Sequence, residues 1–545
     1  MLSVEHLPRF GAFLLGLVVT LALGAWLCRR NALKDPVDRL LCFLAPSLTC
    51  VVLTWCAIGI LKSPSSDWNA DRLAPAVSLL HGYKLYYGPN HGPVLNTIYT
   101  PMSSVVFMPA GLTSSPTLAI LTAVVIGFSL FFLPILLLCS SAQGVGKIRS
   151  PLLGIYLLVS VCHLTLRGGL GVAFTVHADS PALGFAGLAC MVVYLKRGLP
   201  DPSIGTWTLA ALFATLSVWS KQTLAPIVLV LPLWAFLAHG PRAAARSCGA
   251  TAIVLTAATI LFRQIFGKGS FLFNTIRLPK LHPWIYVKPD TFKGFLLLIL
   301  ELGTYCLPMI LLGLIALYLR RRIPPKPLAE STNEQPSTQT WRTWFQGNPW
   351  SLFALTALAM APLAVLGRIK VGGAPNNYAP PLYFLAMTLC AILLEWHERN
   401  RERGLLGLNR GIKVALLTSF LSPLTLMNDQ LIREIDAIGP VSANQQELAY
   451  QYSKKNPGQV YYPWNTLSTL MAEGRLYHFE YGLLDRELAG YPVSDAHFRS
   501  FVPSKLRQVC FPPNRQGEWT MKYLKEFTRR VDIQELPGWI CYERQ

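Results

Sequence analysis

The chain has 545 residues, of which 52% are hydrophobic and 14% are charged, and its mean hydropathy is +0.39. This composition excludes an ordinary water-soluble enzyme and predicts a polytopic membrane protein. The formal net charge is +20. Because Lys and Arg gather in short loops between apolar runs, the charge indicates membrane topology and predicts no nucleic-acid partner.

Apolar runs of about 20 residues, the length that crosses a bilayer core, recur from Phe10 to Met427 and predict twelve membrane-spanning helices. The predicted spans are 10–28, 40–61, 116–139, 151–167, 180–195, 204–220, 222–239, 248–266, 291–319, 349–367, 379–396 and 411–427. Alternate loops carry clusters of Lys and Arg, including the Pro- and Ser-rich linker 320–348, and are therefore expected to face the cytoplasm of a cell inner (cytoplasmic) membrane.

The remaining loops are expected on the outer side: 62–115, 168–179, the junction 220–222, 267–290 and 368–378. Within the first of these, Pro101–Leu112 is too short and too interrupted by proline to cross the bilayer. We expect it to lie along the interface or to dip in as a re-entrant piece. The first helix is expected to be retained as a span, because it lacks a secretory-type cleavage site.

The chain divides into a membrane domain, 1–427, and a polar C-terminal domain, 428–545, which is expected to fold in water outside the membrane. Apparent strands (QVYYP, RQVCF, GWICY) alternate with helical stretches (NTLSTLMAEGRL, WTMKYLKEFTRR), which predicts a small α/β fold. Cys510 and Cys541 lie in this domain, and on an oxidising outer side such a pair is expected to form a disulfide.

Polar side chains in the outer segments are the candidates for a functional site. A carboxylate at the mouth of a membrane cavity can take a proton from an acceptor, and cations beside it can hold a phosphate. Aromatic side chains among them can stack on a sugar ring. The candidates are Asp67, Asp71, Tyr86, Tyr99, His177, Asp179, Lys221, Gln222, Arg368, Lys370, Asn376, Asn377 and Tyr378.

Each candidate also has a purely structural interpretation. The three carboxylates stand at predicted helix starts, where acidic residues cap free amides. The HxD pair at His177 is weak evidence for a metal, and a lysine at a helix end, such as Lys221, can snorkel to the interface. The basic residues of segment 368–378 can anchor anionic lipid. What favours a site is that all of these segments are expected at one face of the membrane.

These residues resemble the GT-C membrane glycosyltransferases, especially the family 39-type branch of protein O-mannosyltransferases and lipid A aminoarabinose transferases. In that family an acidic residue of the first outer loop precedes a Gly and a Tyr- or Pro-rich segment, as Asp67 precedes Gly82 and Tyr99 here. A later helix begins with Asp and Pro, as in HADSPALGF, and a Lys stands between two helices, as in SKQTLAPIVLVLPL. The family often has an acidic pair at the first position, which reads Asp-Trp here, and an extra helix precedes the usual first one.

The resemblance implies an inverting glycosyltransferase that takes its sugar, a hexose or pentose, from a polyprenyl-phosphate donor and passes it to a glycan, lipid or protein acceptor. By similarity, Asp67 and Asp179 are the catalytic carboxylates, and Lys221 contacts the donor phosphate with help from Arg368 and Lys370. The other candidates line the substrate cavity. The resemblance implies no soluble nucleotide sugar, identifies no certain cofactor, and leaves a divalent cation as an open alternative. The rivals are a transporter or lipid flippase and a non-catalytic partner in polysaccharide assembly; transporters tend to show related halves, which this sequence lacks.

Overall fold

The computed structural model describes residues 56–141, 171–197, 199, 201–285, 290–321, 341–402, 444–513, 515 and 517–545, with a few isolated positions before residue 55. The predicted spans 151–167 and 411–427, nearly all of 10–28 and 40–61, and the domain boundary at 427 therefore lie outside the described residues. The prediction of twelve crossings is tested only for the eight spans between.

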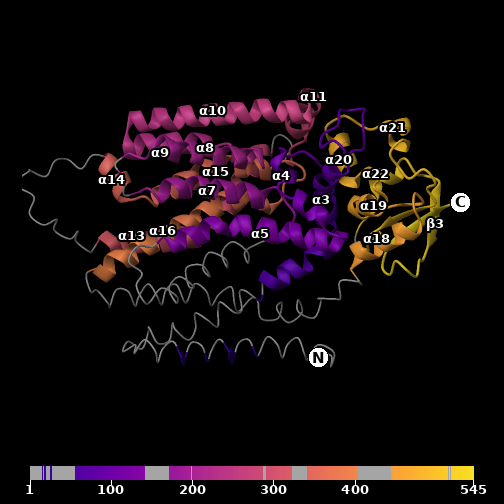
Figure 1. Ribbon diagram of the computed structural model, residues 1–545, viewed down its shortest axis with the longest axis horizontal. Helices are drawn as coiled ribbons and strands as arrows, with labels where there is room; N and C mark the ends of the chain where they lie inside the picture. The colour runs from indigo at the N-terminus through magenta and orange to yellow at the C-terminus, as the bar shows by residue number, and fades with distance from the viewer. Residues whose placement is uncertain are drawn as a thin grey trace, which may run out of the picture.

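Eight long apolar helices lie side by side and form the membrane bundle (Figure 1). Each coincides with a predicted span, within a few residues at most ends. They are α5 (Pro116–Ser140), α7 (Asp179–Tyr194), α8 (Ile204–Val218), α9 (Ile227–His239), α10 (Pro241–Phe266), α13 (Thr291–Arg321), α15 (Ser351–Arg368) and α16 (Ala379–Glu402). Within the described residues, five helical stretches are long and apolar enough to cross a membrane, and a bent pair over 291–318 makes a sixth; α7 and α8 are apolar but shorter.

The bundle has a buried centre and a lipid-facing edge. Of the most apolar stretch of α16, 89% is buried inside the protein, whereas the corresponding value for α10 is 11%. Small residues allow the closest helix contacts, as is common in membrane bundles. A Cβ on Gly184 of α7 would lie 2.4 Å from the Leu130 carbonyl oxygen of α5, so a larger residue there would force the two helices apart.

Short helices cap one end of the bundle. The outer segment 62–115 contributes η2 (Ser63–Ser65), α3 (Asp67–Leu80), α4 (Met102–Val105) and η3 (Met108–Leu112), and no helix of Pro101–Leu112 is long enough to span a bilayer. Gly82, at φ +79°, turns the chain after α3. The other caps are η4 (Gly171–Phe174), η5 (Gln222–Leu224), α11 (Lys268–Leu272), the π-helical turn η6 (Phe273–Arg277), α12 (Leu278–Leu281) and η7 (Pro375–Tyr378).

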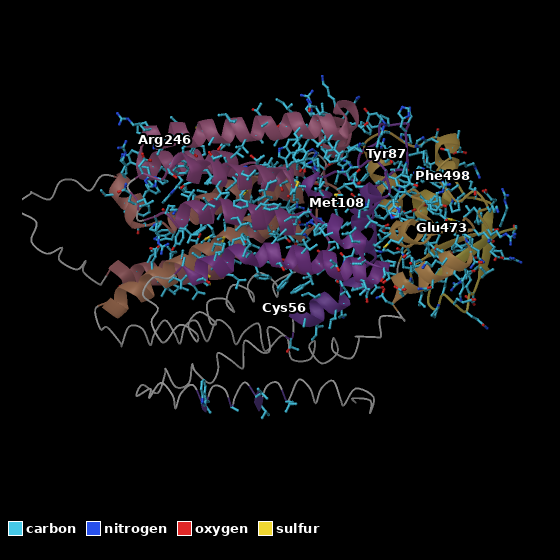
Figure 2. The ribbon with its side chains drawn as sticks, in the orientation of Figure 1. Cys56, Tyr87, Met108, Arg246, Glu473 and Phe498 are labelled. Carbon is cyan, nitrogen blue, oxygen red and sulfur yellow. A yellow bond between two sulfur atoms is a disulfide. The ribbon has the colours of Figure 1, made fainter. Side chains whose placement is uncertain are left out.

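The opposite end of the bundle carries α14 (Trp341–Gly347) and basic residues such as Arg246. Figure 2 shows Arg246 at the far end from Glu473 and Phe498 of the C-terminal domain. Arg246 forms an exposed ion pair with Asp201, with Nη1 2.6 Å from Oδ2. Arg246 and the C-terminal domain therefore lie at opposite ends of the bundle, and the extracytoplasmic location of that domain stays a prediction.

The C-terminal domain lies beyond α3 and combines helices with a four-stranded sheet in the order β1-β2-β4-β3 (Figure 1). The strands are β1 (Val460–Tyr461), β2 (Gln508–Phe511), β3 (Phe527–Val531) and β4 (Ile540–Arg544). The helices are α18 (Gln445–Lys455), α19 (Thr466–Glu473), α20 (Glu480–Leu488), α21 (Asp495–Arg499) and α22 (Glu518–Met521). The predicted small α/β fold is therefore confirmed.

One prediction within this domain is wrong. The stretch 519–530 was expected to be a single helix, but it divides into α22 and the strand β3, which pairs antiparallel with β4. Most of β3 is exposed, and its charged face allowed the segment to pass for an amphipathic helix. Pairing with β4, which lies later in the sequence, decides that this segment is a strand.

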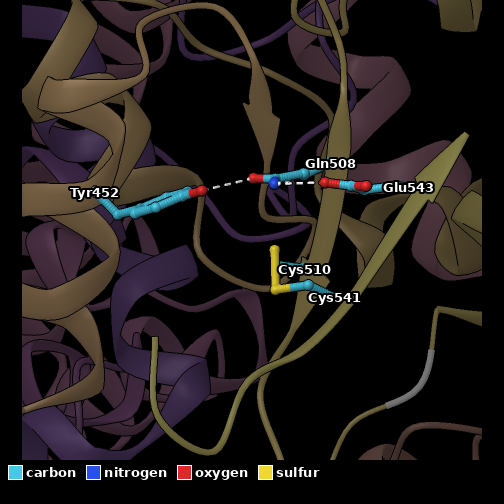
Figure 3. The surroundings of a disulfide bond; sticks show 5 residues. All are labelled: Tyr452, Gln508, Cys510, Cys541 and Glu543. Atoms are coloured by element: carbon cyan, nitrogen blue, oxygen red, sulfur yellow. Dashed lines mark hydrogen bonds between the residues drawn. A yellow bond between two sulfur atoms is a disulfide. The ribbon is translucent and has the colours of Figure 1, made fainter. Parts of the chain in front are cut away.

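Cys510 and Cys541 are joined by the predicted disulfide, because β2 and β4 place them directly opposite each other (Figure 3). Beside them, Tyr452 donates a hydrogen bond to Gln508 at 2.9 Å, and the Gln508 amide donates to Glu543 at 2.9 Å. The disulfide joins β2 to β4, and the hydrogen bond from Tyr452 ties α18 to β2.

Candidate active site

Asp179, the first residue of α7, gathers three of the predicted outer segments at one point. Its Oδ1 accepts a hydrogen bond from Lys221 Nζ at 2.6 Å, and its Oδ2 accepts one from Asn376 Nδ2 at 2.8 Å. His177 Nδ1 lies 2.7 Å from the same Oδ2. Asp179 is completely buried and Lys221 is 2% exposed. The carboxylate is thus fully engaged, and its physical role is to hold Lys221.

The sequence folds in this way because two turns meet the start of α7. The helix α8 ends at Val218, and the amide of Lys221 still donates to the Ser217 carbonyl at 3.0 Å before the chain becomes extended. Gln222 fixes the turn, since its side chain donates to the carbonyls of Ile98 and Thr275 at 2.9 and 2.8 Å. Burial lowers the pKa of His177 to about 4, so the imidazole is neutral.

A cavity of about 530 Å³ opens between this cluster and the C-terminal domain. Its wall carries the cations Arg72, Lys221, Lys280 and Lys370 and the carboxylate Asp485. Aromatic and amide side chains complete it: Trp68, Asn96, Tyr99, Gln222, His282, Asn377 and Tyr481. The predictions that Tyr99, Lys221, Gln222, Lys370 and Asn377 face a shared cavity agree with this lining. His177 lines a small recess beside it, together with Arg72 and Tyr99.

The cavity also touches the membrane bundle. Leu363 and Leu366, near the C-terminal end of α15, belong to its lining. Leu366 is 40% exposed on the bundle, at a position within a helix that is long and apolar enough to span a bilayer. The space therefore extends from an apolar helix surface to the water-soluble C-terminal domain.

Arg72 is the cation that sequence reasoning missed. Its guanidinium lies 4.9 Å from the centre of the Trp68 ring, and among the described residues it has no hydrogen-bonded or ion-paired partner. Burial lowers its pKa, and the neighbouring Tyr99 and Asp179 oppose that shift. The sequence signal that points to Arg72 is its spacing of four residues from Trp68, which places both side chains on one face of a helix.

The neighbouring face of α3 binds the C-terminal domain, so Asp67 and Asp71 do not line the cavity as predicted. Asp67 Oδ2 accepts a hydrogen bond from Arg515 Nε at 3.1 Å. Burial raises the pKa of Asp67, and Arg515 partly offsets this. Asp71 is buried and accepts from the amide and hydroxyl of Thr466, both at 3.1 Å. The helical spacing of Asp67 and Asp71 does place the two carboxylates on one face of α3, but that face packs against α19 and Arg515 of the C-terminal domain.

Three other predicted residues also lie elsewhere. Tyr86 is buried against phenylalanine rings and donates to the Tyr99 carbonyl at 2.7 Å. Tyr378 is buried and donates to Glu301 Oε2 at 2.8 Å. Arg368 lies 3.7 Å from the same Glu301 oxygen and donates to the Gly373 carbonyl at 2.9 Å. Each of these side chains is engaged in holding a loop or a helix pair, so none is free to meet a substrate.

A metal site finds no support in the described part of the chain, where no three His, Cys, Asp or Glu side chains gather as ligands. Lys370 lines the cavity but is partly engaged: its Nζ donates to the Pro279 and Lys280 carbonyls at 2.6 and 3.2 Å. Of the four cations in the wall, Lys221 and Lys370 are held in place by protein groups, whereas Arg72 and Lys280 have no hydrogen-bonded or ion-paired side-chain partner among the described residues.

Comparison with known proteins finds no matching family model and no matching curated protein. Similar solved structures include two of ArnT from Cupriavidus metallidurans, one bound to undecaprenyl phosphate and one in the apo state. They are 11% and 13% identical to this chain, with TM-scores of 0.47 and 0.49, and each comparison covers 90% of this chain and 97% of the other. ArnT is a lipid A aminoarabinose transferase, the branch that the sequence motifs resemble. Similarity at this level does not establish an activity, so the function must follow from the cavity.

Proposed function

We propose that this protein is a membrane glycosyltransferase that moves a sugar from a polyprenyl-phosphate donor to an acceptor at the outer face of a cytoplasmic membrane. The observation that carries the proposal is the cavity that joins the apolar C-terminal end of α15 to the C-terminal domain and has four cations in its wall. A donor with an oily tail and a charged head, and an acceptor from water, can both reach such a space.

Arg72 and Lys221 are the groups best placed to hold the donor phosphate. A guanidinium and an ammonium stabilise phosphate oxygens through charge-assisted hydrogen bonds, and Arg72 has no competing partner among the described residues. Asp179 acts as a positioning residue, since it orients Lys221 at 2.6 Å. Lys370 and Lys280 belong to the same cavity wall, where they can stabilise the negative charge that develops on the departing phosphate.

The reaction is a single displacement. The acceptor hydroxyl attacks the anomeric carbon, the bond from that carbon to the phosphate oxygen breaks, and its electron pair leaves with the polyprenyl phosphate. The configuration at the anomeric carbon is inverted. Tyr99, Trp68 and Tyr481 offer aromatic faces for the sugar ring. The displacement as written uses no cofactor. Measuring sugar transfer with and without a chelator tests whether a divalent cation takes part.

The donor class is supported by the apolar edge of the cavity and by the family resemblance of the motifs. The undecaprenyl phosphate named in one ArnT structure belongs to the same chemical class. The acceptor can be a glycan, a lipid or a protein, and the C-terminal domain, which forms part of the wall through Tyr481 and Asp485, lies where an acceptor from the outer side would enter.

The test uses the full-length protein in detergent with a panel of polyprenyl-phosphate hexoses and pentoses, and membranes from cells lacking the protein as the acceptor source. We expect release of free polyprenyl phosphate together with labelled acceptor. Arg72→Gln should lower turnover about 100-fold, the usual cost of removing one charged stabilising donor.

Arg246→Gln is the matched control, because Arg246 is an exposed, ion-paired arginine at the opposite end of the bundle. A flippase would move lipid across vesicles but form no glycosylated product. Normal expression with no transfer from any donor, or equal transfer by the wild type and Arg72→Gln, would overturn the proposal.

A further inference from the structure

Asp485 brings a carboxylate from the C-terminal domain into the cavity wall. It lies on α20, which the sequence analysis did not single out, and its side chain is 4% exposed. The helix is held against the membrane domain by its neighbour Arg486, whose guanidinium lies 4.5 Å from the centre of the Phe273 ring and donates to the Pro89 carbonyl at 3.2 Å. The contacts of Arg486 with Phe273 and Pro89 therefore fix α20, and with it Asp485, against the membrane domain.

The hydrogen bonding of Asp485 differs from that of other buried carboxylates nearby. Asp179 has both oxygens occupied, and so has Glu480, which accepts from the amides of Trp519 and Thr520. Asp485 Oδ2, by contrast, makes no hydrogen bond within the described residues. Its Oδ1 is 3.6 Å from His282 Nε2, which is itself without a hydrogen bond there.

A buried carboxylate without such partners is costly when it is ionised. Burial raises the pKa of Asp485 to about 8, and the adjacent Arg486 opposes the shift only in part. Burial also lowers the pKa of His282, so the imidazole is a weak counter-charge. Tyr99, Tyr481 and Arg486 interact electrostatically with Asp485, and His282 lies 3.6 Å from it. The charged groups that share its cavity are Arg72, Lys221, Lys280 and Lys370.

We propose that Asp485 is the catalytic proton acceptor of the transfer reaction, supplied to the cavity by the C-terminal domain. This inference rests on the proposed glycosyltransferase function and replaces Asp67 and Asp179 in that role, because those two carboxylates are engaged by Arg515 and by Lys221. His282, at 3.6 Å, is a positioning residue for Asp485.

The step balances as follows. The acceptor oxygen forms a bond to the anomeric carbon while its proton passes to the Asp485 carboxylate. The bond between that carbon and the phosphate oxygen breaks, and the electron pair stays on that oxygen. Arg72 and Lys221 bind the polyprenyl phosphate anion that leaves. Asp485 then returns its proton to water through the cavity. A base whose pKa lies near the working pH is the most effective for this transfer.

The test compares Asp485→Asn and Asp485→Glu with Glu487→Gln, a matched control on the same helix whose exposed carboxylate pairs with Lys522. We expect Asp485→Asn to lower kcat by 10²- to 10⁴-fold, the range typical of a lost general base, without weakening the binding of the free polyprenyl phosphate measured by fluorescence quenching. Asp485→Glu should recover part of the rate, and Glu487→Gln should behave as the wild type.

The pH profile separates catalysis from support of the fold. Wild-type kcat/KM should rise with pH up to an apparent pKa near 8, and this limb should disappear in Asp485→Asn and shift in Asp485→Glu. If Asp485→Asn does not fold, the wild-type profile and Asp485→Glu still decide. A wild type that transfers sugar with no such limb, or an Asp485→Asn variant with normal kcat, would overturn the inference and leave the proposed function standing. Absence of transfer by the wild type would overturn both.

Discussion

Replacing Asp179 with asparagine tests whether the carboxylate at the start of α7 acts by holding Lys221. The substitution preserves the size of the side chain and a hydrogen bond to Asn376, but it removes the charge that faces Lys221 Nζ at 2.6 Å. Lys221 is 2% exposed, so its ammonium is left buried without a counter-ion. Breaking a buried pair in this way costs about 3–5 kcal/mol.

The effect should appear as a lower unfolding temperature of the purified protein in detergent. At about 2 °C per kcal/mol, a value suited to large domains, the loss is roughly 6–10 °C. Transfer activity should fall as well, chiefly through a higher KM for the polyprenyl-phosphate sugar, because a displaced Lys221 no longer meets the phosphate.

The double variant Asp179→Asn/Lys221→Met distinguishes this explanation from a direct catalytic role. Removing the orphaned cation should restore most of the lost stability, because the two substitutions act on one pair and are not additive. Activity should stay low, since the phosphate contact is gone. A double variant that is no more stable than Asp179→Asn alone, or an Asp179→Asn protein with wild-type thermal stability, would refute the reasoning.

Three further outcomes are expected. Thr466→Val removes one of the two hydrogen bonds to Asp71, which should lower stability by about 1 kcal/mol in thermal unfolding; an unchanged midpoint would show that α3 and α19 are held by apolar packing alone. The double variant Cys510→Ser/Cys541→Ser removes a disulfide of sequence separation 31, and the chain-entropy model predicts that the free energy of unfolding falls by about 4 kcal/mol. In a gel, only the wild type should change its mobility on reduction. Asp485 has a native pKa raised from 3.8 to about 8, so the stability that its protonated form contributes is fully present below about pH 4, declines as the pH rises from there and is completely lost above about pH 8, at most about 6 kcal/mol in total; Asp485→Asn should flatten this dependence in unfolding measured across pH.

The membrane bundle was predictable because hydropathy acts locally. A run of about 20 apolar residues has few stable alternatives to a spanning helix, so the eight described spans coincide with their predictions to within a few residues at most ends. The common location of His177, Lys221 and Asn376 followed from loop parity alone. The partners at atomic level, such as Asn376 on Asp179, depend on tertiary contacts that parity does not determine.

The assignments within α3 failed for a related reason. Helical spacing correctly groups Asp67 with Asp71, and it also groups Trp68 with Arg72. It could not tell which of the two faces meets the cavity, because that depends on where the C-terminal domain packs. The strand β3 shows the same limit: its neighbour β4 decides its conformation, and that neighbour is known only from the fold.

The two faces of α3 explain why a water-soluble domain is attached to a membrane bundle at this position. One face of the helix contributes Arg72 to the phosphate end of the cavity, and the adjacent face holds the C-terminal domain through Asp71 and Thr466. That domain in turn contributes Asp485 to the wall of the same cavity. Because a single rigid helix connects the phosphate-binding cation to the domain that carries the proton acceptor, the spacing between leaving group and base is set by the packing on α3. Under the proposed mechanism, sugar transfer therefore requires the docked domain.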